Sequence, residues 1–348
     1  MNIDTSIYAN DAYAQALLQE ARAVAAENVV DPIAFDENYK ELEPAIYSGE
    51  TIIITGPPQN GKSTAVLLMS AKLGIPCLTF SCDEGIQKSA LFGHMEIGPN
   101  GQTVWVDGPL VRSWRDGYIF NAEEILQLVS EKTSWFMKMI DGSKFLMGHN
   151  GEIIPKHPNF RFIATGNPLC RGNKPSNEAF SRRFGVAIDV AELSAKGFLL
   201  LGKSKRPWVS DGFFNASYNL TQAVLNEAKR FGKLNESCGI TQLCSLFGLI
   251  ENDPTPLTYD VFVRKVRNTF INVLTKARIS QEDRDLFQTA NATQAILQKM
   301  YKEYAASPRP TSVTGGGVPA PDPAAQPAAS SQTMSAGTQM LNKLRRIK

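Results

Sequence analysis

The sequence has no excess of charge of either sign and no long apolar stretch. Of its 348 residues, 36 are lysine or arginine and 34 are aspartate or glutamate, so the formal net charge is +2. Such a chain has no overall field that would draw it to nucleic acid or an anionic membrane. No apolar run approaches the roughly 18 residues of a membrane-spanning helix, and the first residues do not resemble a secretory signal. We therefore expect a cytoplasmic protein.

Cysteine and histidine are scarce, and their spacing excludes several kinds of site. The five cysteines include no C-x-x-C pair and lie among apolar residues, which is typical of reduced thiols in a cytosol. The histidines, His94, His149 and His157, lack a metal-binding spacing, and we expect each to be structural or exposed. No G-x-S-x-G nucleophile elbow is present. The sequence therefore argues against a metal hydrolase and against a serine hydrolase.

What the chain does contain is an alternation of short apolar runs and helical patterns. The apolar runs predict five strands, at residues 51–55, 77–80, 118–122, 160–164 and 186–190. Helices are predicted between them, at residues 65–73, 122–140 and 177–184. Strands that alternate with helices predict an α/β fold with a parallel sheet covered on both faces.

The same patterns suggest how the chain is divided. We expect an N-terminal helical appendage over residues 1–35, with its helix at 11–27, and the α/β core over 36–195. A small all-helical domain is predicted over 196–305, and its helices are expected at 220–231, 240–251, 259–277 and 281–304.

The last forty residues have a different composition. Residues 306–333 are rich in proline, alanine, serine and glycine, which bury too little apolar surface to fold, so a flexible linker is predicted. Residues 334–348 regain apolar spacing and carry basic charge. This basic amphipathic peptide is either a docking helix or a frayed tail.

A phosphate-binding pattern joins the first predicted strand of the core to the helix that follows it. Gly56, Gly61, Lys62 and Ser63 fit the P-loop pattern G-x-x-x-x-G-K-[ST]. In such a loop the backbone N–H groups and the helix N-terminus bind phosphates. We expect Lys62 to neutralise the β- and γ-phosphates of ATP and the Ser63 hydroxyl to bind Mg²⁺. The predicted cradle consists of Gly56, Pro57, Pro58, Gln59, Asn60, Gly61, Lys62, Ser63 and Thr64.

Two further strand ends carry polar residues suited to ATP hydrolysis. Glu123 and Glu124 follow the third predicted strand, where a P-loop enzyme needs acids that hold Mg²⁺ through water and orient the attacking water. Alternatively, both are exposed glutamates at a helix start, favoured by the helix dipole. Asn167 follows the fourth strand and is a candidate hydrogen-bond donor to the γ-phosphate or the attacking water.

Eight sequence blocks in the same order make the chain similar to the MoxR, midasin and dynein-related branch of AAA+ ATPases. The blocks are residues 56–63, 83–85, 91–93, 105–111, 115–117, 123–124, 157–168 and 179–184. The resemblance covers about residues 45–190. It implies an ATPase core, a helical lid, and a homo-oligomeric ring, expected to be a hexamer, with ATP between subunits. It also implies that Glu123 is the acid that orients Mg²⁺, Glu124 the catalytic base, and Asn167 the polar sensor.

The resemblance has further implications for partners. Arg183 matches the arginine that reaches the neighbouring subunit's γ-phosphate, and Arg182 is the reserve candidate; the alternative is a surface arginine in a basic pair. Residues 92–111 resemble a β-hairpin insertion of the family, in which Trp105 either contacts a substrate or packs within the hairpin. Relatives often act with a von Willebrand factor A domain protein, which is therefore a candidate partner.

Two positions depart from the family pattern. Glu123 stands where aspartate is usual, and a carboxylate displaced by about 1 Å can cost ~100-fold in rate, so slow hydrolysis is expected. Gln242 stands where a second sensor arginine is usual. Either Arg264 or Arg267 replaces that arginine, or the second sensor is missing.

Three functions follow as hypotheses. The first is a Mg²⁺-dependent, ring-forming ATPase that remodels a protein partner, as a chaperone or motor. The second is a slowly hydrolysing, ATP-dependent switch or scaffold. The third is a ring motor that acts on DNA, which the near-neutral charge disfavours.

Overall fold

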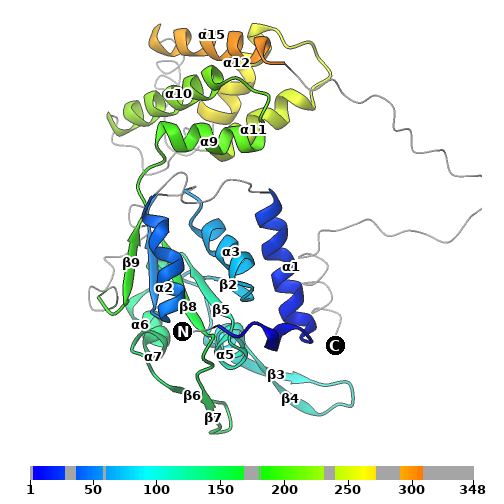
Figure 1. Ribbon diagram of the computed structural model, residues 1–348, viewed down its shortest axis with the longest axis vertical. Coiled ribbons are helices and arrows are strands. Elements are labelled where there is room, and N and C mark those ends of the chain that lie inside the picture. Colours follow the sequence, from blue (N-terminus) through cyan, green and yellow to red (C-terminus); the bar gives the residue numbers. More distant parts are fainter. Residues whose placement is uncertain are drawn as a thin grey trace, which may run out of the picture.

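The chain forms an α/β part followed by an all-helical part (Figure 1). The computed structural model describes residues 3–27, 37–57, 60–167, 180, 182–230, 240–271 and 291–308. The predicted linker and tail peptide therefore lie, from residue 309 onward, outside the described residues. Among the described helices, none is both long and apolar enough to cross a membrane.

Five parallel strands form the central sheet, in the order β2-β5-β8-β1-β9. They are β1 (Ile52–Thr55), β2 (Cys77–Ser81), β5 (Ile119–Glu123), β8 (Arg161–Gly166) and β9 (Val186–Asp189). Each of the five predicted apolar runs forms one of these strands, and the predicted parallel α/β fold is confirmed. Because the strands are parallel, all five carboxyl ends lie at one edge of the sheet.

Side chains of the strands alternate between two cores, as the two-residue period of a strand requires. Ile53, Phe120 and Phe162 belong to the core on one face. Ile52 and Ile54 belong to the core on the other face. The sheet is therefore buried on both sides, which explains why its strands have continuous apolar runs.

Helices cover both faces. The core that contains Ile52 is completed by α1 (Ala12–Glu27), α2 (Leu42–Ser48) and α3 (Lys62–Leu73). The core that contains Ile53 is completed by α4 (Lys88–Phe92), α5 (Pro109–Asp116) and the short helices between residues 125 and 140.

The N-terminal segment is built into the α/β part. The short 3-10 helix η1 (Ser6–Tyr8) precedes α1, and the Tyr8 hydroxyl donates to the carbonyl of Gly117 at 2.6 Å. The Tyr118 hydroxyl donates to the carboxylate of Asp11, and the Arg112 guanidinium lies 3.5 Å from the ring centre of Tyr13. Together with the packing of α1 on α3, these contacts place the N-terminal segment in the same core as the sheet.

The prediction of one continuous helix over residues 122–140 is wrong. Strand β5 extends to Glu123, and Glu124 then has a left-handed backbone with φ of 54°, which a right-handed helix cannot contain. Four short pieces follow: η4 (Ile125–Gln127), α6 (Ser130–Thr133), η5 (Ser134–Phe136) and α7 (Met137–Ile140). Of the helix predicted over 177–184, residues 177–179 and 181 lie outside the described residues, and residues 182–183 form a turn.

Two antiparallel hairpins project from the α/β part at the end away from the helical part (Figure 1). The predicted one pairs β3 (Gly93–Ile97) with β4 (Thr103–Asp107). Its turn uses Gly101 at φ of 75°, a conformation that glycine adopts without steric cost. The second pairs β6 (Phe145–Met147) with β7 (Ile153–Pro155) and was not predicted.

The helical part has its own core. It contains α9 (Ala195–Lys205), α10 (Asp211–Arg230), α11 (Ile240–Glu251), α12 (Tyr259–Val266) with the π-helical turn η6 (Arg267–Ile271), and α15 (Asn291–Ala306). The prediction for 240–251 matches α11, and those for 220–231, 259–277 and 281–304 overlap α10, α12 and α15. Helix α9 was not predicted. Residues 272–290 lie outside the described residues.

Candidate nucleotide site

The P-loop connects β1 to α3 and is shaped by two glycines with positive φ. Gly61 caps the N-terminus of α3 with φ of 74°, and Gly56 has φ of 148° directly after β1. A Cβ atom at Gly56 would lie 2.4 Å from the carbonyl oxygen of Val190, so only glycine fits there. The predicted cradle thus begins at a glycine that packs directly against the end of β9 and ends at the N-terminus of α3, which is a favourable place for a phosphate. Pro58 and Gln59 lie outside the described residues.

Two polar side chains of the loop, Lys62 and Asn60, make hydrogen bonds that hold its shape. The Lys62 ammonium donates to the carbonyl oxygens of Gly56 at 2.9 Å and Pro57 at 2.7 Å, and this side chain is largely buried. The Asn60 amide donates to the carbonyl of Ala191, on the segment that leads from β9 to α9. The loop is therefore bonded directly to the connection between the α/β part and the helical part. Ser63 and Thr64, in the first turn of α3, are partly exposed.

The predicted acids and the predicted sensor lie at the same sheet edge as the P-loop. Thr55 of β1 is in register with Gly166 of β8, and Ala122 of β5 with Ala164. Glu123 therefore ends β5 and Asn167 follows the neighbouring strand β8, which lies between β1 and β5. Strand spacing puts the β1 and β5 axes about 10 Å apart. Glu123 is partly exposed, whereas Asn167 is fully buried.

Glu124 has an unusual backbone and a side-chain partner that the sequence did not indicate. Its φ of 54° places it in the left-handed region, which costs a residue with a Cβ about 1–2 kcal/mol. The Gln127 amide donates to its carboxylate at 3.3 Å. Both features fix where this carboxylate points, as a positioned catalytic base would need.

Arg183 lies far from the P-loop of its own chain. The turn that contains it precedes β9, and the N–H of Val186 donates to the carbonyl of Thr51, just before β1 begins. Arg183 is thus at the amino ends of β1 and β9, one strand length from the P-loop. Its guanidinium contacts both carboxylate oxygens of Asp141, at 2.7 and 2.8 Å, and is half exposed. The neighbouring Arg182 is also exposed.

The helical part carries the remaining candidates. Gln242, in α11, is 7% exposed, so the family position of the second sensor is a buried amide. Arg264 is exposed in α12, and Arg267 is partly exposed at the start of η6. No contact that the structure describes joins either arginine to the P-loop residues.

The residues present fit ATP and Mg²⁺. The loop joins a strand to the N-terminus of α3 through two glycines with positive φ, and the Lys62 ammonium lies on its backbone carbonyls and supplies positive charge there. The Ser63 hydroxyl and the Glu123 carboxylate are oxygen donors, which Mg²⁺ prefers, and both follow strands of one sheet edge. Bound there, the ion would neutralise charge on the phosphates.

Most of the α/β part is similar to known proteins. Residues 51–184 match the family model described as "AAA domain (dynein-related subfamily)". The matched region runs from just before β1 to the turn before β9 and is similar to an AAA domain of this subfamily. Its bacterial relatives include Protein NorQ of Paracoccus denitrificans, 32% identical over 39% of this chain and 52% of NorQ. The denitrification regulatory protein NirQ of Pseudomonas aeruginosa is 28% identical over 47% of this chain and 64% of NirQ.

A eukaryotic relative confirms the resemblance to the midasin branch. Midasin of Giardia intestinalis is 25% identical over 62% of this chain, although the match covers only 5% of midasin. The chain thus aligns with between half and two thirds of the two bacterial relatives and with a small share of midasin. The matched AAA domain contains the P-loop, Glu123, Glu124, Asn167 and Arg183.

Proposed function

We propose that this protein is a Mg²⁺-dependent ATPase that assembles into a ring, a hexamer by analogy with its family, and remodels a protein partner. The observation that carries the proposal is the meeting of the P-loop, Glu123, Glu124 and Asn167 at one edge of a parallel sheet. Lys62 would hold the phosphates, Glu123 and Ser63 the ion, and Glu124 would accept a proton from the attacking water.

The route from nucleotide to mechanical change is short. Asn60 of the P-loop donates to Ala191, and Gly56 approaches Val190, four to five residues before α9 begins. A change in the loop on ATP hydrolysis would therefore act directly on the connection to the helical part. This supports a function in which the helical part moves relative to the sheet. A von Willebrand factor A domain protein is the candidate partner by family analogy.

The proposal is tested by measuring phosphate release from Mg²⁺-ATP and molecular mass by light scattering. We expect Lys62→Ala to lower turnover at least ~100-fold, because it removes a positive charge from the transferring phosphate. Lys72→Ala is the matched control: Lys72 lies at the other end of α3 and pairs with Glu43 at the surface. Wild-type protein without hydrolysis, or a Lys62→Ala variant as active as wild type, would refute the ATPase.

A slowly hydrolysing switch is the second candidate, and specific contacts favour it. Glu123 stands where the family has aspartate, and Asp141 holds Arg183 in an ion pair. The first difference displaces a carboxylate and the second occupies an arginine that hydrolysis would use. In this state ATP would assemble the protein without rapid turnover.

Glu123→Asp separates the two candidates. If the extra methylene of Glu123 misplaces its carboxylate, we expect this variant to raise turnover by up to ~100-fold while ATP affinity changes little. Steady-state turnover and binding of a fluorescent ATP analogue measure the two quantities. A wild-type protein that already turns over rapidly, with no gain in Glu123→Asp, would eliminate the switch.

A further inference from the structure

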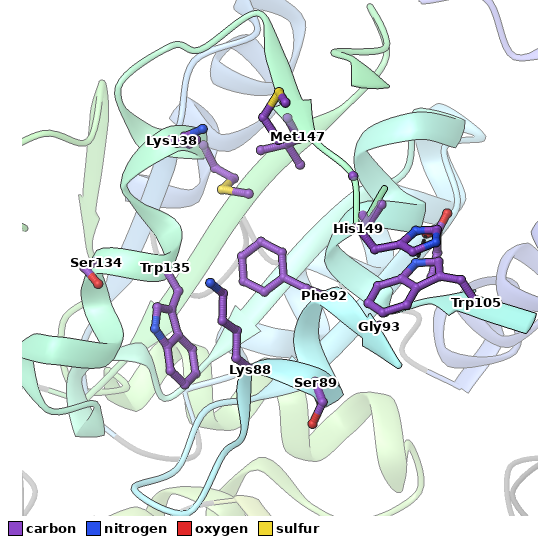
Figure 2. A pocket seen from close by; sticks show the side chains of 15 residues that line it. Lys88, Ser89, Phe92, Gly93, Trp105, Ser134, Trp135, Lys138, Met147 and His149 are labelled. Atoms are coloured by element: carbon purple, nitrogen blue, oxygen red, sulfur yellow. Dashed lines mark hydrogen bonds between the residues drawn. The ribbon is translucent and has the colours of Figure 1, made fainter. Parts of the chain in front are cut away.

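A cavity of about 660 Å³ lies between the two hairpins (Figure 2), and none of its lining residues belongs to the P-loop. We call it the hairpin cavity; α4, β3, β4, α7 and the β6–β7 turn all contribute to its lining. Its apolar lining includes Phe92, and the buried Met139 and Leu146. Lys88 and Trp135 lie on one side of Phe92 in Figure 2, and Trp105 and His149 on the other.

One wall of the hairpin cavity joins the two hairpins. The Trp105 ring of β4 stacks on the His149 ring of the β6–β7 turn, with centroids 4.4 Å apart and planes at 8°. The Trp105 indole N–H donates to Asp107 at 2.9 Å, and Asp107 pairs with Arg115. The acidic charge of the cavity is thus already compensated, and Trp105 is held in place rather than free.

The other side carries positive charge that is not compensated. Lys88 and Lys138 both line the cavity and are exposed. Within the described residues, neither ammonium group has a carboxylate at ion-pair distance; Lys88 lies 5.5 Å from the ring centre of Phe92. The hairpin cavity therefore combines an apolar floor with two ammonium groups open to a ligand.

Exposed apolar side chains are concentrated on the two hairpins that contribute to the cavity, and one of them, Met147, lines it. Among the described residues, ten large apolar side chains are exposed, and seven of them are on the two hairpins. These seven are Met95, Ile97, Val104, Val106, Phe145, Met147 and Ile153. Such a concentration of exposed apolar surface is typical of a surface that contacts another protein.

We propose that the hairpin cavity binds an extended peptide segment of a protein partner, in which an aliphatic or aromatic side chain is adjacent to a carboxylate. The apolar side chain would occupy the floor at Phe92 and Met139, and the carboxylate would pair with Lys88 and Lys138. The proposal rests on the proposed action on a protein partner and names the chemistry of that partner.

A nucleic acid fits less well. Its phosphates would meet the carboxylates of Glu96 and Glu152 on the hairpins. Single-stranded nucleic acid is bound by stacking of bases on aromatic rings, and the Trp105 ring is already stacked on His149.

The test uses the full-length chain and fluorescein-labelled peptides, with fluorescence anisotropy as the readout. The probe is a short capped peptide in which aspartates alternate with phenylalanine and leucine; one matched peptide has asparagine for aspartate, and another serine for the apolar residues. We expect only the probe to bind measurably, with an affinity that falls as salt rises. If the asparagine peptide binds as tightly as the probe, the lysines do not bind a carboxylate. If the serine peptide binds as tightly as the probe, the apolar floor does not bind a side chain. Either result would overturn the proposal.

The variant is Lys88→Glu combined with Lys138→Glu. Because both side chains are exposed, the fold should be retained, which circular dichroism checks. We expect probe affinity to fall roughly 10-fold or more, since two attractive pairs become repulsive. Lys144→Glu is the matched control, because Lys144 is exposed near β6 but does not line the cavity. An unchanged affinity in the double variant would overturn the proposal.

Other results identify other occupants. Competition by a single-stranded oligonucleotide would overturn the peptide in favour of nucleic acid. Two results together would identify a contact between copies of this chain: the probe does not bind the wild-type protein, and the double variant changes the molecular mass of the assembly. They would overturn the peptide proposal. If the protein binds the probe but has no ATPase activity, the peptide site is supported and the proposed ATPase function is refuted. If the protein hydrolyses ATP but does not bind the probe, the ATPase function is supported and the peptide site is refuted.

Discussion

At the scale of single residues, Glu124 combines strain with a proposed catalytic role. Among the described residues it is the one non-glycine with a positive φ. Such strain persists where the surrounding structure overrides the local preference, and it often occurs at active sites. Here β5 ends at Glu123 and the buried Ile125 and Leu126 follow, so packing on both sides forces the turn through Glu124.

Two substitutions separate the strain from the chemistry. Glu124→Gln keeps the Cβ and removes the base, so turnover should fall ~100-fold or more while ATP still binds. Glu124→Gly also removes the strain, so its free energy of unfolding should rise by about 1 kcal/mol. Urea denaturation and phosphate release measure both effects.

Contrary outcomes are clear for each substitution. Full activity in Glu124→Gln would remove Glu124 from the mechanism. A Glu124→Gly variant that is less stable than wild type would show that its left-handed conformation carries no strain.

At the scale of elements, the connection between α11 and α12 depends on an ion pair. The Lys265 side chain of α12 is 10% exposed, and its ammonium donates to the Asp253 carboxylate and, at 2.6 Å, to the carbonyl of Leu249. This hydrogen bond from Lys265 holds the pKa of Asp253 well below its usual range. The pair therefore fixes α12 against the end of α11.

The lowered pKa predicts how the stability of the helical part depends on pH. Because Asp253 binds a proton less readily when folded, its contribution is complete above the unfolded pKa of 3.8 and is lost as pH falls through the lower folded pKa. Asp253→Asn should lower the melting temperature at pH 7, since it leaves the Lys265 ammonium without its carboxylate.

Thermal melts across a pH series check this prediction. The difference between wild type and Asp253→Asn should shrink as pH falls below 3.8. Asp260→Asn, at the first turn of α12, is a control whose carboxylate has no ion pair among the described contacts. A difference that is constant with pH would contradict a stabilising role of the Asp253 charge.

At the scale of the whole molecule, the distance between Arg183 and the P-loop indicates how copies would be arranged. The two sites lie at opposite ends of β1, whose four residues span about 13 Å. Arg183 is therefore one strand length from the P-loop of its own chain, and we propose that it serves the nucleotide of a neighbouring copy. Its present partner, Asp141, lies at the end of α7, next to Lys138 and Met139 of the hairpin cavity.

Arg183→Ala should lower turnover of the assembled protein by about 10³-fold without weakening ATP binding, because an arginine in trans acts on the transition state. Arg182→Ala is the matched comparison, since Arg182 is the adjacent exposed arginine. Mixing Arg183→Ala with the inactive Lys62→Ala variant should restore part of the activity if the two residues act in different subunits. A mixture with no activity would contradict action across subunits.

Much of the fold follows from local sequence. The five strands of the sheet, the P-loop between the first strand and its helix, and α11 each depend on apolar periodicity or glycine spacing within a few residues. The β3–β4 hairpin was found for the same reason, because its turn residues and alternation are contiguous. The roles of the nucleotide-site residues remain predictions, although the structure places most of them at one sheet edge.

Tertiary contacts decided the rest. The left-handed turn at Glu124 divides a segment whose periodicity favours one helix, since packing of β5 and η4 overrides local preference. The β6–β7 strands, three residues each, are too short for a two-residue period to be recognised. The stack of Trp105 on His149 and the pairing of Arg183 with Asp141 join residues more than forty positions apart. The sequence determined that a phosphate loop is present, because that motif is contiguous. The folded chain decided that the proposed arginine lies at the opposite strand end and that two lysines line a cavity beside the stack that joins the two hairpins.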